Sequence, residues 1–231
     1  MNNLSAFETK IEVTFKNKDL LRQALVHRSY LNEHPDFSVG HNERLEFLGD
    51  AVLEIVITEH LYLNYPNTPE GDLTNWRASL VNAKMLYRIA SELGVENFLF
   101  LSRGESKDKN SKARQYILAN SIEAIIGAIY LDQGIEPARQ FILRNIATKL
   151  EDILRSESYV DPKSKFQEIA QEKVGITPAY KTLSEEGPDH EKKFTVGLYL
   201  GEELVSQGEG LSKQEAQIAA AEAGLKNKNW N

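Results

Sequence analysis

The chain contains no cysteine among its 231 residues. Disulfide bonds and thiolate metal sites are therefore excluded, and a cytoplasmic location is expected, because disulfides belong to oxidising compartments. A run of about 18 apolar residues is also missing, so we expect no membrane span. The N-terminus lacks the charged-then-apolar pattern of a secretory signal.

Positive charge is scarce. The chain has 27 Lys and Arg against 34 Asp and Glu, a net charge of −7, which by itself argues against nucleic acid as a partner. Residues 161–231 contain no arginine, nine Lys and twelve Asp or Glu, and are therefore net −3 (9 − 12). Any binding of nucleic acid must depend on where the few cations lie.

Residues 1–155 are predicted to form a helical domain, because apolar residues recur at spacings of three and four between Gly- and Pro-containing breaks. A polar stretch at residues 102–112 is predicted to be a loop. The predicted helices cover residues 19–30, 43–65, 71–94, 113–134 and 137–154.

The pattern changes at a predicted linker, residues 156–160, and residues 161–228 are predicted to form a second, α+β domain. Its order is α-β-β-β-α, with both helices on one face of an antiparallel sheet. Ser212 and Glu215 have the spacing of a capping box at the start of the last helix. The predicted elements are a helix at 163–174, strands at 179–186, 192–200 and 203–210, and a helix at 211–226.

The segment 42–57, NERLEFLGDAVLEIVI, is mostly apolar yet carries four carboxylates. On a helix these carboxylates fall within an arc of about 80°, and the rest of the circumference is apolar. We therefore expect a helix buried on most sides with a narrow acidic stripe. The stripe consists of Glu43, Glu46, Asp50 and Glu54.

A second apolar helix, residues 116–132, carries Asn120 and Glu123 on one side with Gly127 between them in angle. A glycine inside a helix costs up to about 1 kcal/mol relative to alanine, which is easier to understand where another backbone packs closely. Packing the two helices together would bring Asn120 and Glu123 to the acidic stripe. Such oxygen ligands suit Mg²⁺ or Mn²⁺, and carboxylate-held Mg²⁺ is a common means of phosphodiester hydrolysis. The alternative is that these are ordinary polar residues at the edge of a helix bundle, ion-paired with Arg44, Arg77 or His27.

Several segments resemble motifs of the ribonuclease III family. NERLEFLGDAVL (42–53) is similar to its signature, and ALVHRSY (24–30), EGDLTNWRASLV (70–81) and ILANSIEAIIGAIYLD (117–132) resemble its flanking motifs. Residues 161–226 resemble a double-stranded RNA-binding domain. The resemblance covers nearly the whole chain, in the family's order.

This resemblance implies an Mg²⁺-dependent endonuclease, with Mn²⁺ as a substitute and no small-molecule cofactor, that cleaves double-stranded RNA as a homodimer. It implies products with 5′-phosphate and 3′-hydroxyl ends, in the processing of ribosomal and other precursor RNAs. Matched to the family's motifs, Glu46, Asn120 and Glu123 would be metal ligands, and Asp50 and Glu123 catalytic. Supporting acidic residues would be Glu43 and Glu70, and Phe47 would insert into the partner subunit or, alternatively, pack in the core.

Asn120 departs from the family pattern, which has Asp in LADxxEA. An amide keeps a carbonyl oxygen but loses a full charge, so metal affinity should fall and repulsion within the cluster should ease.

The second domain offers three sets of RNA contacts, because duplex RNA is recognised by shape across two minor grooves and the major groove between them. Ser164, Gln167 and Gln171 on the first helix suit one minor groove, and His190 in the first strand-strand loop suits another. Ser212 and Lys213 start the last helix, where the helix dipole also attracts phosphate. Each set has a plain alternative, since Gln and Lys on a helix often face water and Ser212 is sufficiently explained as a cap.

Two other functions stay open from the sequence. A double-stranded RNA-binding regulator that has lost cleavage is conceivable because of Asn120. An all-helical protein–protein scaffold would leave the acidic residues without a purpose.

Overall fold

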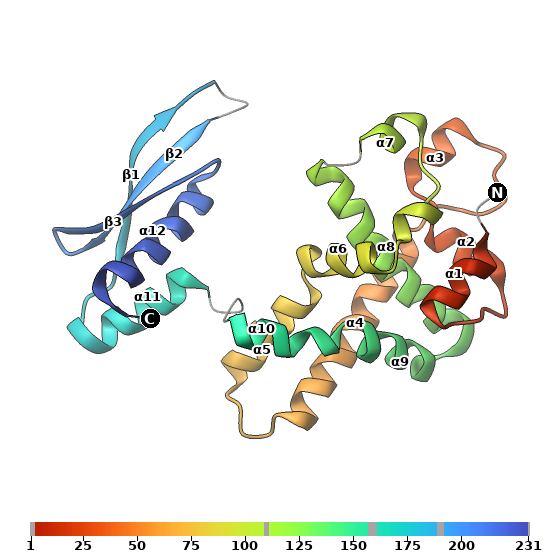
Figure 1. The fold of residues 1–231 in the computed structure, drawn as a ribbon, viewed down its shortest axis with the longest axis horizontal. Coiled ribbons are helices and arrows are strands. Elements are labelled where there is room, and N and C mark those ends of the chain that lie inside the picture. The colour runs from red at the N-terminus through yellow and green to blue at the C-terminus, as the bar shows by residue number, and fades with distance from the viewer. Residues whose placement is uncertain (1–2, 109–110, 157–160, 189–191, 231) are drawn as a thin grey trace. The chain divides into compact units, whose positions relative to one another are not determined.

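The computed structural model describes residues 3–108, 111–156, 161–188 and 192–230. The chain divides into two compact units, residues 1–159 and residues 160–231 (Figure 1). The first is helical and the second is α-β-β-β-α, so the predicted fold classes are confirmed. The predicted linker lies outside the described residues except for Ser156.

The first unit is built from short helices around two long ones, α4 and α8. Its elements are α1 (Leu4–Ile11), α2 (Lys18–Ala24), α3 (Arg28–Glu33), α4 (Glu43–Asn64), α5 (Glu70–Val81), α6 (Ala83–Glu92), the 3₁₀ helix η1 (Val95–Phe98), α7 (Arg103–Lys107), α8 (Lys112–Gln133), α9 (Ile135–Asn145), the 3₁₀ helix η2 (Ala147–Lys149) and α10 (Leu150–Ser156).

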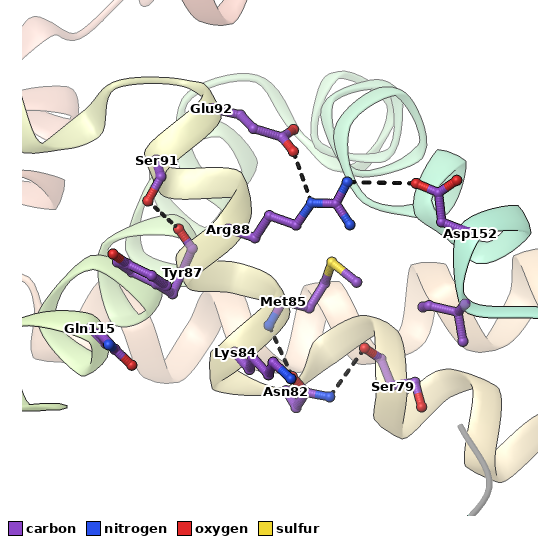
Figure 2. A pocket seen from close by; sticks show the side chains of 11 residues that line it. Ser79, Asn82, Lys84, Met85, Tyr87, Arg88, Ser91, Glu92, Gln115 and Asp152 are labelled. Carbon is purple, nitrogen blue, oxygen red and sulfur yellow. Dashed lines mark hydrogen bonds and ion pairs between the residues drawn. The ribbon is translucent and has the colours of Figure 1, made fainter. Parts of the chain in front are cut away.

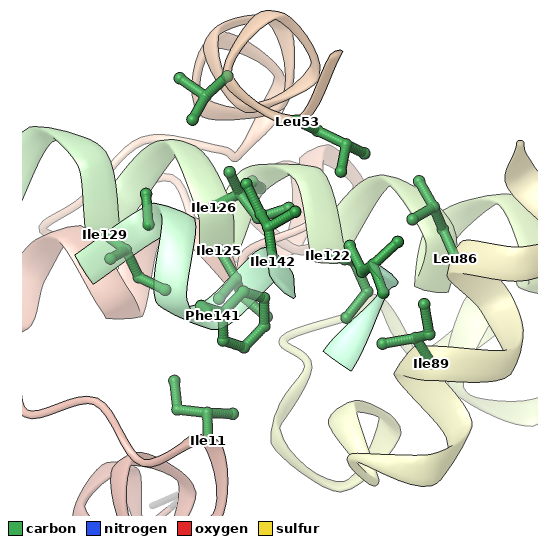
Figure 3. Close-up of a cluster of buried hydrophobic side chains, with 14 of the residues drawn as sticks. Ile11, Leu53, Leu86, Ile89, Ile122, Ile125, Ile126, Ile129, Phe141 and Ile142 are labelled. Carbon is green, nitrogen blue, oxygen red and sulfur yellow. The ribbon is translucent and has the colours of Figure 1, made fainter. Parts of the chain in front are cut away.

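Helix α8 forms the centre of this unit (Figure 3). Its isoleucines at 122, 125, 126 and 129 are fully buried, because α2, α4, α6 and α9 pack around it. Leu53 of α4, Leu86 of α6 and Phe141 of α9 close the core from different sides. A helix buried this completely is a rigid support for any polar side chain at its surface.

Helices α4 and α8 cross with their backbones in contact at two glycines, Gly49 and Gly127. A Cβ on Gly49 would overlap the carbonyl oxygen of Glu123 and lie 2.8 Å from the amide nitrogen of Gly127. A Cβ on Gly127 would in turn overlap the carbonyl oxygen of Leu45. The expectation that Gly127 marks a close approach to the acidic helix is confirmed.

Three predicted helices are each divided in the structure. The helix predicted at 71–94 breaks at Asn82, where the backbone is extended. The Asn82 side chain caps α6 by accepting from the Met85 N–H at 2.9 Å. The helix predicted at 19–30 breaks because Val26 pairs with Phe100 in an isolated bridge and His27 caps α3. The helix predicted at 137–154 is interrupted by η2. The caps at Asn82 and His27 are local side-chain hydrogen bonds, which the periodicity of apolar residues does not reveal.

The prediction of a loop at residues 102–112 was wrong in part. Ser102 accepts from the Glu105 N–H at 3.2 Å and starts the short helix α7, and Ser111 caps α8 in the same way. Side-chain oxygens at these two positions satisfy N–H groups that a polar loop would leave to water.

The second unit contains helix α11 (Pro162–Val174), strands β1 (Ala179–Glu186), β2 (Lys193–Leu200) and β3 (Glu203–Gly210), and helix α12 (Lys213–Lys228). The strands form an antiparallel sheet in the order β1-β2-β3. Phe166 of α11, Leu198 of β2 and Ala220 of α12 are fully buried between the sheet and the helices. Gly208 lets α12 approach closely, because a Cβ there would overlap the backbone of Ala220.

The predicted capping box at α12 forms only in part. Ser212 Oγ accepts from the Glu215 N–H at 3.1 Å as expected. The Glu215 carboxylate, however, accepts from the N–H of Leu211 at 2.9 Å, one residue before the cap. The cap still fixes the start of α12.

Candidate functional site

The crossing of α4 and α8 brings their polar residues together. Asn120 of α8 donates its amide Nδ2–H to Glu46 Oε1 of α4 over 2.9 Å, although the two residues are 74 positions apart. Asp50, one turn after Glu46, and Glu123, one turn after Asn120, lie near this pair, since the charges of Asp50 and Glu46 both act on the Glu123 carboxyl. The carbonyl of Glu123 itself lies against Gly49, so the glycine crossing holds the backbone that carries this carboxylate.

The charges at this crossing are poorly compensated. Burial, followed by the nearby carboxylates of Asp50 and Glu46, raises the pKa of Glu123 to about 8. Burial also raises the pKa of Glu46, while the Asn120 amide opposes that shift, and Glu43 and Asp50 add to it. Electrostatically, the site favours any added positive charge, whether a proton or a cation.

The two ends of the acidic stripe are balanced by cations instead. Glu43 lies 3.5 Å from Arg28 and 3.7 Å from His41. Glu54 pairs with Arg77 at 3.1 Å, which is the ion pair that the bundle-edge interpretation expected. That interpretation therefore holds for Glu54, whereas among the described residues no ion pair reaches Glu46, Asp50 or Glu123.

Glu70 lies apart from this cluster. It begins α5 and lines a cavity of about 250 Å³ with Thr58, Tyr62 and Arg77, further along α4 than Glu54. The structure of one chain therefore does not bring Glu70 to Glu46 and Glu123.

The donor types at the crossing fit a hard divalent cation. Glu46, Asp50 and Glu123 supply carboxylate oxygens, Asn120 supplies an amide oxygen, and the chain offers no thiolate. As the side chains stand, no three His, Asp or Glu residues in the described part of the chain form a ready metal site. In the structure Glu46 Oε1 accepts a hydrogen bond from the Asn120 amide nitrogen.

Helix α4 has an exposed apolar side, so the prediction that it is buried on most sides was wrong. Phe47 is 81% exposed and Ile55 is 60% exposed, and Ala51 lies exposed between them. The core alternative for Phe47 is therefore excluded in the single chain. The i, i+4, i+8 spacing of these three residues was the sequence signal for such a face, and it was missed.

The candidate RNA contacts on α11 are at the surface. Gln167 and Gln171 are both exposed, and Gln171 Nε2 donates to Thr177 Oγ1 at 2.9 Å. Ser164 is exposed too, and its hydroxyl donates to Asp161 at 2.8 Å, which caps the helix. His190 lies outside the described residues.

At the start of α12, Lys213 is exposed but not free. Its ammonium lies 2.7 Å from Glu185 Oε1 of β1 and 5.6 Å from the centre of the Phe194 ring. Ser212 serves as the cap described above. A phosphate at Lys213 would have to compete with Glu185, which an exposed ion pair in water allows at little cost.

A cavity of about 960 Å³ lies between α6, α10 and the ends of α5 and α8, away from the predicted site residues (Figure 2). Arg88 crosses it, with Nε 3.0 Å from Glu92 and Nη2 3.5 Å from Asp152. Lys84 and Gln115 also line it.

Among the described residues, no helix is both long and apolar enough to cross a membrane.

Family models match both units. A model described as ribonuclease-III-like matches residues 17–150, and one for the double-stranded RNA binding motif matches residues 162–228. Ribonuclease 3 of Borreliella burgdorferi is 44% identical over 225 residues, which cover 97% of this chain and 91% of that protein. Ribonuclease 3 of Carboxydothermus hydrogenoformans is 42% identical over 223 residues, 96% of this chain and 94% of that protein.

A solved structure of a ribonuclease III nuclease domain is also similar to this chain. The nuclease domain of ribonuclease III from Campylobacter jejuni is 40% identical, with a TM-score of 0.57. The match covers 63% of this chain and 97% of that domain. This chain therefore belongs to the ribonuclease III family and is an endoribonuclease that carries a double-stranded RNA-binding domain.

Proposed function

We propose that the protein hydrolyses double-stranded RNA with Mg²⁺ held at the α4–α8 crossing, and that Mn²⁺ can substitute. The observation that carries this proposal is the set of oxygen donors Glu46, Asp50, Asn120 and Glu123, gathered at a rigid crossing with too little positive charge to balance them. Glu54, elsewhere on α4, has a cationic partner in Arg77, whereas no cation of the described residues pairs with Glu46, Asp50 or Glu123.

Glu46, Asn120 and Glu123 would hold the ion, and Asp50 would act beside Glu123 on the attacking water. Bound Mg²⁺ would supply an activated water and stabilise the developing phosphate charge. The new bond joins the water oxygen to phosphorus and the bond to the 3′ oxygen breaks, which leaves 5′-phosphate and 3′-hydroxyl ends. Glu43 supports the cluster electrostatically, since its charge contributes to the raised pKa of Glu46.

The working form is proposed to be a homodimer formed through the exposed apolar side of α4. Phe47, Ala51 and Ile55 are all exposed along one side of α4, and burying this apolar side against a second copy would be favourable. A region of the Campylobacter jejuni nuclease domain is described as involved in dimer formation. A dimer would also allow Glu70 of one subunit to act at the α4–α8 crossing of the other subunit.

The second unit is proposed to hold the duplex through Gln167 and Gln171 in one minor groove and Lys213 on phosphate. Ser164 and Ser212 border these contacts, and His190 is proposed for the second minor groove. Because Lys213 is the cation at the start of α12, its removal should weaken binding and lower the salt dependence by about one unit. We propose ribosomal and other precursor RNAs in the cytoplasm as substrates.

A second candidate function, binding without cleavage, is favoured by one observation: a neutral amide at position 120 donates to Glu46. Labelled duplex RNA incubated with Mg²⁺ and the full chain separates the two. We expect wild type to cut and Glu123→Ala to bind without cutting, with 5′-phosphate on the products. Binding by wild type without cutting in Mg²⁺ or Mn²⁺ would overturn the hydrolysis proposal, and recovery in Asn120→Asp would assign the loss to that amide.

A further inference from the structure

The side of α8 that carries Glu123 continues past the acidic site toward the start of the helix. At about 100° per residue, Lys112, Tyr116, Asn120 and Glu123 lie within an arc of about 80°. Lys112 is about 16 Å from Glu123 along the helix axis. One face of a single rigid helix therefore presents acids at the crossing and, two to three turns away, an aromatic ring and a cation.

This continuation is open to solvent. Tyr116 is 50% exposed, and Lys112 and Gln115 are exposed beside it. Lys84, on the first turn of α6, closes the other side, and these residues with Ala83 line a cavity of about 190 Å³. Lys84 and Gln115 also line the 960 Å³ cavity of Figure 2, so the two hollows adjoin.

The next feature is the charge of Lys84 and Lys112. Within the described parts of the chain, neither Lys84 nor Lys112 forms an ion pair, whereas Arg88 and Lys149 nearby are both paired with Glu92. In a chain of net charge −7, two unpaired cations on either side of an exposed tyrosine form a local positive surface. We refer to Lys84, Lys112 and Tyr116 as the α8 strip.

We propose that the α8 strip binds the sugar-phosphate backbone of the duplex RNA strand that is cut at Glu123. Lys84 and Lys112 would each contact a phosphate, and the Tyr116 ring would pack on a ribose between them. Charge complementarity and continuity with the acidic site on the same helix face favour this occupant. The inference rests on the proposed function and extends it, because it adds a positioning surface on the nuclease unit that is independent of the second domain.

The strip also resolves an electrostatic difficulty. A cluster of carboxylates repels a polyanion, and removal of charge at the crossing would damage the site. Cations placed two to three turns away can hold the strand without neutralising the acids, since exposed charges beyond about 8–10 Å are largely screened from each other. Positioning of this kind contributes to KM and to the salt dependence of binding, and little to the chemical step.

The test compares the full chain with Lys84→Gln/Lys112→Gln and with Tyr116→Ala. The matched control, Lys10→Gln/Lys16→Gln, removes the same charge from exposed lysines outside both cavities. We expect the Lys84/Lys112 variant to raise KM for duplex RNA at least fivefold with kcat within twofold, and Tyr116→Ala to raise KM less. All variants should keep their circular dichroism spectrum, because the changed side chains are exposed.

A second readout separates failure of the strip from failure of hydrolysis. In a Glu123→Ala background, the slope of log Kobs for duplex RNA against log salt should fall by about 2 in the Lys84/Lys112 variant, one unit for each phosphate contact. The control should change the slope by much less. A slope and a KM that match those of the control would overturn the proposal, even where wild type cuts normally. An unchanged slope in a protein that does not cut would also overturn it.

Discussion

Gly49 and Gly127 meet backbone to backbone where α4 crosses α8. A Cβ on Gly127 would lie 3.1 Å from the Gly49 amide nitrogen and would overlap the Leu45 carbonyl. Because side chains are absent on both helices at this point, Glu46 and Asn120 come within hydrogen-bonding distance. The distance between the helix axes thus determines whether the acidic cluster exists at all.

Gly49→Ala should therefore destabilise the fold and separate the acidic residues. The added methyl would meet backbone, which cannot rotate away, so we expect the free energy of unfolding to fall by about 3 kcal/mol, at the upper end of overpacking effects. Urea denaturation measures this change. The matched control is Gly71→Ala in the first turn of α5, where a Cβ meets nothing within 4 Å and stability should stay or rise by up to ~1 kcal/mol. Equal effects of the two substitutions would contradict the crossing as described.

Much of the fold was predictable from the sequence, because its signals are local or periodic. The three strands are found where alternation and turn residues placed them, with β1 and β3 matching residue for residue. The packing of α4 on α8 was also predictable, since a glycine inside an apolar helix, such as Gly127, indicates that another backbone packs against it. The breaks at Asn82 and Val26 were not, because caps and a single bridge to Phe100 depend on tertiary partners.

The candidate site was predictable to a lesser degree. Helical spacing placed Glu43 and Glu54 in the same stripe as Glu46, but it could not show which acids would be paired. Arg77, one of the cations considered, pairs with Glu54, and Arg28, which was not among them, pairs with Glu43. Long charged side chains form ion pairs with residues of other helices. Spacing along one helix contains no information on which residues those are. The exposed side of α4 was visible in the spacing and was overlooked in favour of general apolarity.

Metal-free protein should lose stability as the pH rises from about 5 to about 8. The folded-state pKa of Glu123, about 8, lies above its unfolded value, so the folded chain binds the extra proton in this range and deprotonation costs more in the folded state. The loss should be on the order of a few kcal/mol by urea denaturation in EDTA. Glu123→Gln cannot ionise and should flatten this part of the profile. A wild-type profile that already matches Glu123→Gln would contradict the uncompensated burial of Glu123.

Asn120→Asp should strengthen Mg²⁺ binding and weaken the metal-free fold. The substitution replaces the amide donor to Glu46 by a like charge, so we expect a loss of about 2 kcal/mol in EDTA, typical of a hydrogen bond to a charged group. The added charge should lower the Kd for Mg²⁺ about tenfold, since ligand charge tunes the affinity of such sites. Calorimetry and urea denaturation measure the two effects. Asn32→Asp, on exposed α3, is the control and should change neither quantity.

Phe47→Asp should convert the proposed α4-mediated dimer into a monomer. An aspartate in the middle of a buried apolar interface would lose its hydration without a partner, so association should weaken at least a hundredfold. Sedimentation velocity over a concentration series gives the oligomeric state. Leu211→Asp changes a residue of the second unit that is 72% exposed and should leave the dimer intact. Wild type that stays monomeric at high concentration would remove the proposed role of Phe47.

Calorimetric titration of Mn²⁺ into the full chain, compared with Glu123→Ala and Glu54→Gln, tests where the metal binds. Both variants remove one carboxylate from the α4–α8 region, but Glu54 is already paired with Arg77 and Glu123 has no cationic partner among the described residues. If the crossing is the metal site, wild type and Glu54→Gln bind with similar affinity, and Glu123→Ala, still folded by circular dichroism, binds at least tenfold more weakly. Equal Mn²⁺ affinity in wild type and Glu123→Ala would show that the acidic cluster is not the metal site.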